Sequence, residues 1–307
     1  MTTHNKLVAG FVGVGVMGRH MVRNLAAAGM VVQVFDVVPE ALEALPRHDN
    51  IRLAKSLPDA LSGADIVITM LPDTPHVEAV VFGEGGIVAT LPSGSLFVDM
   101  STISAHATRV LSEKLSERGI TMLDAPVSGG PVGAENGTLS IMVGGDADGF
   151  ARAYPFFQAM GETITHVGAA GAGQTVKLCN QLICGINIQA ICEALALGRA
   201  CGVDLEQMRD VLLGGSAASW MLDRLGSQMI SGDASAGFRI DLMFKDLRLV
   251  METAMQANVP LPATALVTSQ YIDARAHGEG GNGNQALFKV YDRMTAQDRE
   301  RSHGAGA

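Results

Sequence analysis

The sequence predicts an α/β protein in two parts: a doubly wound, mostly parallel sheet first, and an all-α region after it. Short apolar segments alternate with helical patterns up to about residue 165, as in a sheet whose crossover helices cover both faces. Beyond that point helical periodicity continues with almost no strand signal. We therefore predict one domain over residues 1–167, an all-helical domain over 168–298, and a disordered tail over 299–307.

Each predicted strand is a short apolar run bounded by turn residues. The helix predicted over 173–201 is long and apolar on nearly all sides, which is typical of a helix buried between domains or subunits. It joins the two parts. The predicted strands are 7–12, 31–35, 64–71, 96–100, 120–125, 139–143 and 163–167, and the other predicted helices are 17–28, 204–213, 217–230, 238–257, 262–277 and 284–295.

Composition and charge narrow the function classes. The chain has 307 residues, 22 of them basic and 31 acidic, which gives a net charge of −9. This balance disfavours nucleic acid and anionic membranes as partners, because both need clustered Lys and Arg.

We expect no bilayer span, since polar residues interrupt the apolar stretch 182–200, and no signal peptide, hence a cytoplasmic protein. The four cysteines are expected to be reduced core residues rather than metal ligands.

A GxGxxG turn lies between the first predicted strand and the first predicted helix. Gly13 permits a tight turn, Gly15 lets a pyrophosphate approach the backbone, and Gly18 lets the helix pack closely on the sheet. With a strand before it and a helix after it, this turn predicts a Rossmann-like dinucleotide site that also includes Val16 and Met17. A glycine-rich turn in an unrelated α/β domain is the alternative.

Asp36, at the end of the second predicted strand, distinguishes between the nicotinamide cofactors. Its carboxylate can accept hydrogen bonds from both adenosine ribose hydroxyls, but it would repel a 2′-phosphate. Val37, Val38 and Pro39 supply no cation for that phosphate. NAD is therefore favoured over NADP. The alternative is that Asp36 only caps the loop before the next helix.

The segment Ser128-Gly129-Gly130 is a candidate substrate cradle. It follows a predicted strand at its C-terminal end, where open α/β sheets bind ligands. A hydroxyl beside exposed backbone amides suits a carboxylate. A simple turn is the alternative.

Two lysines are candidate functional groups. Lys177 shares one face of the helix 173–201 with Asn180 and Gln181, and a lysine in an apolar helix indicates a cleft and a role in proton transfer. The alternative is a side chain that extends to the surface. Lys245 and Asp246 lie within the helix 238–257, where they could reach a ligand or form a surface pair, and the residues alone leave both open.

Four segments, in this order along the chain, resemble the β-hydroxyacid dehydrogenase family: 13–18, 124–130, 171–181 and 238–247. The family includes 3-hydroxyisobutyrate, threonate and 6-phosphogluconate dehydrogenases and tartronate semialdehyde (2-hydroxy-3-oxopropionate) reductase. The resemblance implies that Lys177 is the catalytic acid/base and that the Ser128 cradle holds a substrate carboxylate, with Asn180 or Gln181 assisting. The other positions that it implies, beside the cofactor, are Leu71, Pro72, Thr102 and Lys245.

Within the family, residues 137–146 and 177–181 most resemble tartronate semialdehyde reductase. Gln181 stands where many relatives have Asn, with Asn180 one residue earlier, as in the reductases. Near the C-terminus, Asn284 and Gln285 replace a Gly-Asp-His/Tyr-Ser pattern that is frequent in the family. This substitution leaves the identity of the substrate open, but it does not change the predicted type of reaction.

The resemblance implies hydride transfer between NAD(H) and a small 3-hydroxyacid or semialdehyde, with 2-hydroxy-3-oxopropionate as the first choice. 3-Hydroxyisobutyrate, threonate, succinate semialdehyde and glyoxylate are the alternatives. Imine reductases share the architecture but typically lack the lysine. A catalytically silent nucleotide-binding scaffold is the alternative of a different class. The apolar helix 173–201 also predicts a homodimer or homotetramer.

Overall fold

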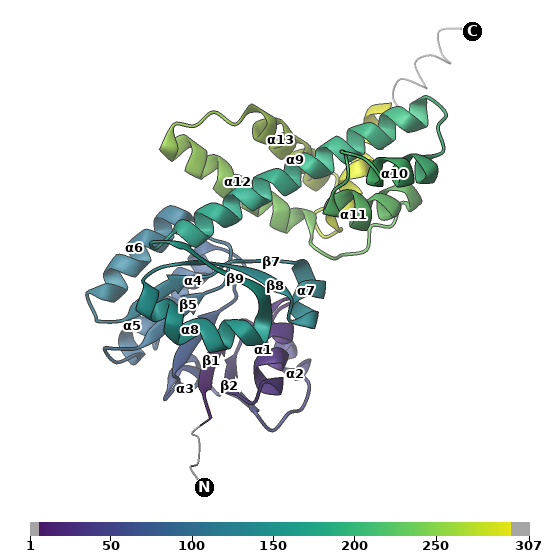
Figure 1. Ribbon diagram of the computed structural model, residues 1–307. Coiled ribbons are helices and arrows are strands. Elements are labelled where there is room, and N and C mark those ends of the chain that lie inside the picture. Colours follow the sequence, from purple (N-terminus) through teal and green to yellow (C-terminus); the bar gives the residue numbers. More distant parts are fainter. Residues whose placement is uncertain (1–5, 296–307) are drawn as a thin grey trace. The chain divides into compact units, whose positions relative to one another are not determined.

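The chain divides into two compact units in the computed structural model, which describes residues 6–295 (Figure 1). We call Met1–Lys177 the N-terminal unit and Leu178–Ala307 the C-terminal unit. The division falls inside one continuous helix, α9 (Ala172–Ala200), whereas the sequence predicted a border at residue 167. The predicted tail 299–307 lies outside the described residues.

The described part of the N-terminal unit contains a nine-stranded sheet with the order β3-β2-β1-β4-β5-β6-β8-β7, and β9 pairs with β8. The six strands from β3 to β6 in this order are parallel to one another, whereas β8 is antiparallel to β6 and β7 and parallel to β9. This order confirms the predicted doubly wound sheet. The strands are β1 (Val8–Val12), β2 (Val31–Phe35), β3 (Ile51–Leu53), β4 (Ile66–Thr69), β5 (Leu96–Asp99), β6 (Thr121–Asp124), β7 (Val127–Ser128), β8 (Leu139–Gly144) and β9 (Gly161–Gly168).

Helices cover both faces of this sheet, and each face has its own core. Because side chains alternate along a strand, Ile66 and Ile68 of β4 pack in one apolar cluster, whereas Val67 packs in another. The first cluster includes residues of α1 and α8, and the second includes residues of α3 to α6. The helices are α1 (Gly18–Ala27), α2 (Pro39–Glu43), α3 (Leu57–Leu61), α4 (Thr74–Phe82), α5 (Ile87–Thr90), α6 (Ala105–Ser116), α7 (Gly130–Asn136) and α8 (Ala147–Met160).

The C-terminal unit is helical over its described residues, 178–295, as predicted. Ile188, Cys192 and Leu195 of α9 form its core together with Leu247 and Tyr271. Its other elements are α10 (Leu205–Leu213), α11 (Trp220–Ser231), α12 (Ile240–Ala257), α13 (Pro262–Ala276), the 3-10 helix η1 (Asn284–Leu287) and a helical segment over 288–295.

By length and composition alone, α9 meets the requirement for a membrane span, which the sequence analysis had not expected. Among the described residues it is the one helix that does so, with a mean hydropathy of 1.4 over 18 residues. Within the C-terminal unit, however, the helix also makes polar contacts: Glu193 accepts a hydrogen bond from Tyr291, and Arg199 pairs with Asp292. Together with its buried apolar residues, these contacts are those of a core helix.

The structure corrects two smaller expectations. Cys179 and Cys201 are exposed rather than core residues, whereas Cys192 is buried, which raises the pKa of its thiol. Strands β3 and β7 had not been predicted. They have only three and two residues, too few to form an apolar pattern.

Candidate active site

The loops that follow four parallel strands of the N-terminal unit hold most of the predicted cofactor positions. The glycine turn follows β1, Leu71 and Pro72 follow β4, Thr102 follows β5, and the Ser128 cradle comes after β6. Because the carboxyl ends of parallel strands share one edge of a sheet, the fold brings these loops to that edge. The strand order also reverses between β1 and β4, where sheets of this kind bind ligands.

The glycine turn has the shape that a dinucleotide requires. Gly13 has a φ of +97°, and a Cβ added there would collide with the Met70 carbonyl oxygen. A Cβ at Gly18 would collide with the Gly13 carbonyl oxygen, so this glycine lets α1 begin close to the turn. Gly15 is exposed, and no atom lies within 4 Å of the place where its Cβ would stand. Two glycines are therefore needed for packing, and Gly15 leaves open space that phosphates can approach.

The other positions of the turn also suit a dinucleotide. Val16 is 47% exposed beside the open space at Gly15, and Met17 is half-buried against the first core. The turn is followed by α1, whose N-terminus favours an anion.

Asp36 lies against the glycine turn. Its Oδ2 accepts the Val14 N–H at 2.7 Å, and its Oδ1 accepts the Val38 N–H at 2.9 Å. Asp36 thus shapes the loop, as the alternative interpretation expected. Each carboxylate oxygen has a second lone pair, so ribose hydroxyls can still donate to it.

A buried polar network joins the loops after β4 and β5. Asp99 Oδ1 accepts hydrogen bonds from the Thr69 hydroxyl at 2.7 Å and from the Ser101 N–H at 3.1 Å. Ser101 Oγ in turn accepts the Leu71 N–H at 2.8 Å. Asp99 is fully buried, and its Oδ2 has no partner among residues 6–295. Burial therefore raises the pKa of Asp99 to about 6, and Asp124 on the next strand adds to the rise.

Asp124, at the end of β6, holds the first turn of α9. Its Oδ1 accepts the Gly171 N–H at 2.7 Å, and its Oδ2 accepts the Gln174 N–H at 2.8 Å. The first turn of a helix has N–H groups without partners in the helix, so a carboxylate stabilises it. Burial raises the pKa of Asp124, and these backbone N–H groups oppose the rise. Lys177 stands one turn after Gln174 and is 6% exposed.

The predicted cradle begins in β7, which pairs with β8. Ser128 is half-buried, and the two glycines after it have φ values of +132° and +60°, which strongly favour glycine. Asn24 of α1 donates a hydrogen bond to the Ala134 carbonyl of α7 at 2.8 Å. The helix that follows the cradle is thereby tied to the helix that follows the glycine turn.

The C-terminal unit holds the remaining candidates in one chain of contacts. Asn180 Nδ2 donates to Gln181 Oε1 at 2.8 Å, and Gln181 Nε2 donates to Asp246 Oδ2 at 2.5 Å. Lys245 Nζ lies 2.8 Å from Asp246 Oδ1. Gln181 is 4% exposed, and its amide joins Asn180 to Asp246. Lys245 and Asp246 are not a surface pair.

Asn284 and Gln285, the departure from the family pattern, are buried in the C-terminal unit. Tyr271 donates to Asn284 Oδ1 at 3.4 Å, and Gln285 Nε2 donates to the Ser235 carbonyl at 2.8 Å. Both side chains therefore hold the 3-10 turn in place.

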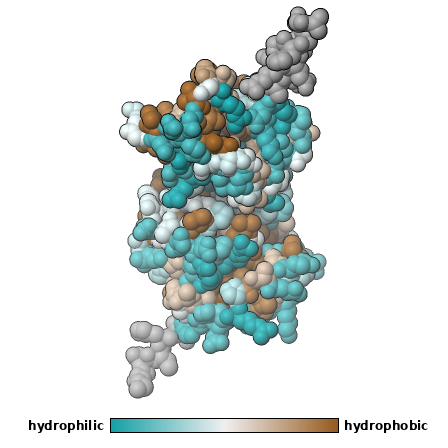
Figure 2. Space-filling model, turned by 90° about the vertical axis from the view of Figure 1, so that its right-hand side faces the viewer, coloured by the Kyte–Doolittle hydropathy of each residue, from teal (hydrophilic) through white to brown (hydrophobic). Residues whose placement is uncertain are grey.

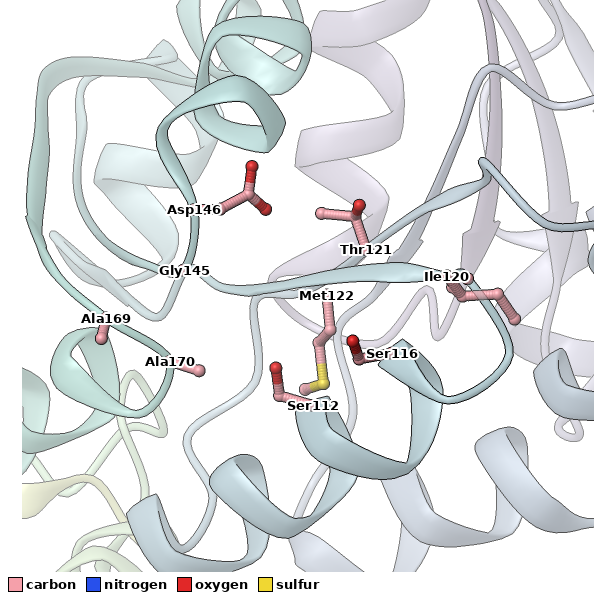
Figure 3. A pocket seen from close by; sticks show the side chains of 10 residues that line it. Ser112, Ser116, Ile120, Thr121, Met122, Gly145, Asp146, Ala169 and Ala170 are labelled. Carbon is pink, nitrogen blue, oxygen red and sulfur yellow. The ribbon is translucent and has the colours of Figure 1, made fainter.

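One clear pocket of the N-terminal unit lies away from all these residues. It measures about 440 Å³ and is lined by Ser112 and Ser116 of α6, Met122 of β6 and Asp146 at the start of α8, among others (Figure 3). None of the predicted site residues lines it.

Sequence reasoning missed Asp99, Asp124 and Gln174 as site residues, and it left the role of Asp246 open. One signal was available: an acidic residue that ends an apolar strand, such as Asp99, has to find hydrogen-bond donors if it is buried. The donors that bind Asp99 and Asp124 include groups 30 to 50 residues away, which no local pattern shows.

Two protein-family models match the chain. Residues 8–168 match the NAD binding domain of 6-phosphogluconate dehydrogenase. Residues 171–291 match the NAD-binding region of NADP-dependent 3-hydroxyisobutyrate dehydrogenase.

Characterised relatives align over nearly the whole chain. The 2-hydroxy-3-oxopropionate reductase of Escherichia coli is 41% identical, over 93% of this chain and 97% of that protein. The 2-(hydroxymethyl)glutarate dehydrogenase of Eubacterium barkeri is 38% identical, over 93% of this chain and 95% of that protein. The structure of Mycobacterium tuberculosis 3-hydroxyisobutyrate dehydrogenase with L-serine superposes with a TM-score of 0.83 at 32% identity, covering 93% of this chain and 99% of that one.

Proposed function

The chain belongs to the β-hydroxyacid dehydrogenase family, and we propose that it interconverts a small 3-hydroxyacid and its semialdehyde, with 2-hydroxy-3-oxopropionate as the first choice. It is an NAD-binding oxidoreductase that acts on CH–OH groups. One observation carries the proposal: Lys177 is buried in an apolar helix whose first turn is fixed to the carboxyl edge of the dinucleotide-type sheet.

In the proposed reaction Lys177 moves the proton. The bound nicotinamide supplies the hydride in reduction and accepts it in oxidation. As the C–H bond forms at the aldehyde carbon, negative charge develops on the carbonyl oxygen, and the protonated Nζ of Lys177 stabilises that charge and donates its proton to the oxygen. In oxidation, the neutral amine takes the hydroxyl proton. The proton balance closes through solvent: Lys177 takes up a proton from water after each reduction and releases one after each oxidation.

The other proposed roles concern binding. The Ser128 hydroxyl and the N–H groups of Gly129 and Gly130 bind the substrate carboxylate. Asn180 contributes a side-chain amide, oriented by Gln181, and Lys245 is held by Asp246 for a role beside cofactor and substrate. Asp36 selects NAD over NADP, because its carboxylate lies against the glycine turn, where it would repel a 2′-phosphate, and no cation follows it in sequence.

Support for 2-hydroxy-3-oxopropionate comes from the E. coli reductase and from residues 137–146 and 177–181. The other relatives act, by their names, on different small acids. The acid is therefore the part of the proposal that a substrate panel decides.

The panel follows NADH oxidation with the semialdehydes of tartronate, methylmalonate and succinate and with glyoxylate, and NAD reduction with threonate and L-serine. NADPH and NADP run in parallel. We expect the highest kcat/KM with tartronate semialdehyde and NADH. Tight NADH binding without turnover of any of these compounds would overturn the proposal and favour a nucleotide-binding scaffold. A cyclic imine completes the panel, and turnover of the imine alone would favour an imine reductase.

We also propose that the protein is a cytoplasmic homodimer or homotetramer. Hydrophobic side chains lie among hydrophilic ones on the surface (Figure 2). In the C-terminal unit an apolar groove of about 510 Å³ runs along α9, lined by Ile183, Ile186 and Ala190 among others, and Ile183 is 62% exposed. Such a groove is typical of an interface between subunits. Light scattering on the purified protein checks the prediction, and a monomer at micromolar concentration would contradict it.

A further inference from the structure

We propose that Gln174 is a positioning residue for hydride and proton transfer. Its side chain binds the loop that contains Thr102, and its backbone belongs to the helix turn that precedes Lys177. The inference rests on the roles proposed above for Thr102 and Lys177. Gln174 itself touches neither substrate nor cofactor in this account.

One end of Gln174 holds the loop after β5. Its Nε2 donates to the Ser101 carbonyl oxygen at 2.8 Å, and its Oε1 accepts the Ile103 N–H at 3.1 Å. Thr102 lies between these two residues, so a single side-chain amide clamps the loop on both sides of the predicted nicotinamide contact. Gln174 is completely buried, and no water competes for these bonds.

The other end of Gln174 belongs to the first turn of α9, which is anchored independently. The Gln174 N–H donates to Asp124 Oδ2, while Asp124 Oδ1 takes the Gly171 N–H. A Cβ at Gly173 would stand only 2.7 Å from the Asp124 carbonyl oxygen, so this glycine lets the helix approach the strand end closely. Lys177 follows Gln174 by three residues, within one rigid turn of the helix.

The clamp extends to the loop after β4. Ser101, whose carbonyl Gln174 binds, also accepts the Leu71 N–H through its hydroxyl, and its own N–H is held by Asp99. Leu71, Thr102 and Lys177 are therefore connected through buried hydrogen bonds with Gln174 as the common member. Hydride and proton transfer require their donors at near-contact distance from one substrate, and a displacement of about 1 Å can lower the rate about 100-fold.

A second buried glutamine provides a matched control. Gln33 of β2 is 5% exposed, and its Nε2 donates to the Ser62 carbonyl at 2.8 Å. It resembles Gln174 in burial and in its bond to a backbone carbonyl, but it contacts none of the loops discussed above. The replacement of Gln33 therefore measures how much stability and activity the protein loses when a buried glutamine outside the site is removed.

The experiment compares Gln174→Met and Gln33→Met with the wild type on the best substrate of the panel. We expect similar losses of Tm in both variants. Only Gln174→Met should lower kcat, by about 10- to 100-fold, and raise the primary isotope effect with deuterated NADH, while the KM values change less than about threefold. Equal kcat values for the two variants, after correction for the folded fraction, would overturn the inference.

A second readout does not depend on turnover. Amide hydrogen exchange of the protein without cofactor should accelerate at Ile103 and Leu71 in Gln174→Met and remain unchanged there in Gln33→Met. Unchanged exchange at both amides would also overturn the inference. If the wild type turns over no substrate of the panel, the proposed function fails, whereas the exchange experiment still decides whether Gln174 holds the loop.

Discussion

The two units of the protein hold their candidate residues in different ways. In the N-terminal unit, the buried carboxylates Asp99 and Asp124 and the amide of Gln174 bind backbone groups of loops and of a helix start. In the C-terminal unit, Asn180, Gln181, Asp246 and Lys245 bind one another through side chains.

The two kinds of bond differ in how easily the structure can adapt when one of them is lost. Backbone groups cannot change partners without moving a loop, so a lost acceptor in the N-terminal unit should be costly. Side chains can rotate without moving the backbone, and Lys245, at one end of these contacts, is 15% exposed, so water can replace part of the bond that this lysine loses.

The largest effect on stability is expected from Asp124→Asn. The new amide nitrogen would face the N–H of Gly171 or Gln174, leaving a buried donor without an acceptor, and the free energy of unfolding should fall by about 3–4 kcal/mol. Urea denaturation measures the change. The control is Asp146→Asn, which alters the exposed cap of α8 and should cost less than about 1 kcal/mol, since Asn also caps helices. Similar costs in the two variants would remove the contrast between backbone anchoring and ordinary capping.

The pH dependence of stability should reveal Asp99. Its pKa is about 6 in the folded protein against 3.8 ordinarily, so the folded state binds its proton more tightly than the unfolded state does. The stability that this proton contributes is fully present below about pH 4, falls as the pH rises and is lost above about pH 6. The total corresponds to roughly 3 kcal/mol. Relative to Asp99→Asn, the wild type should lose that amount between pH 4 and pH 8, and parallel pH profiles would show that Asp99 is ionised throughout.

An intermediate effect is expected at Asp36. Asp36→Ala removes the acceptor for the ribose hydroxyls and the charge that repels a 2′-phosphate, so the preference for NADH over NADPH should fall about 10- to 30-fold. The ratio of kcat/KM values for the two cofactors measures this. Val38 makes its hydrogen bond through the backbone, so Val38→Ala serves as a control that leaves the ratio unchanged. An unaltered ratio in Asp36→Ala would mean that Asp36 only shapes the loop.

The smallest effect is expected in the C-terminal unit. Asp246→Asn keeps one acceptor oxygen and loses the charge that holds Lys245, which should cost about 1.5 kcal/mol of stability, the low end for a bond to a charged group, because Lys245 is partly exposed. Activity should fall because Lys245 and Gln181 lose their common anchor. A loss as large as that of Asp124→Asn would show that the two units do not differ in the proposed way.

The same contrast explains what the sequence could predict. Periodicity located the long elements well: the predicted strand 31–35 coincides with β2, and the predicted helix 173–201 differs from α9 by one residue at each end. The glycine turn and Lys177 could be identified because each is recognised from the spacing of residues close to it in the sequence. Asp124 and Gln174 were visible as residues, but their partners lie 47 to 73 positions away and are set by strand order. The role of Asn284 and Gln285 was left open by the sequence, because their burial depends on tertiary packing.

Lys177 is proposed to carry the proton, and the turnover of the Lys177→Ala variant measures that role. The variant should bind NADH with nearly the wild-type Kd, retain its Tm within a few degrees, and lose at least about 100-fold in kcat. Lys55→Ala, at an exposed lysine of the same unit, should keep wild-type kcat. Near-normal turnover by Lys177→Ala would contradict the account, since another group would then have to move the proton.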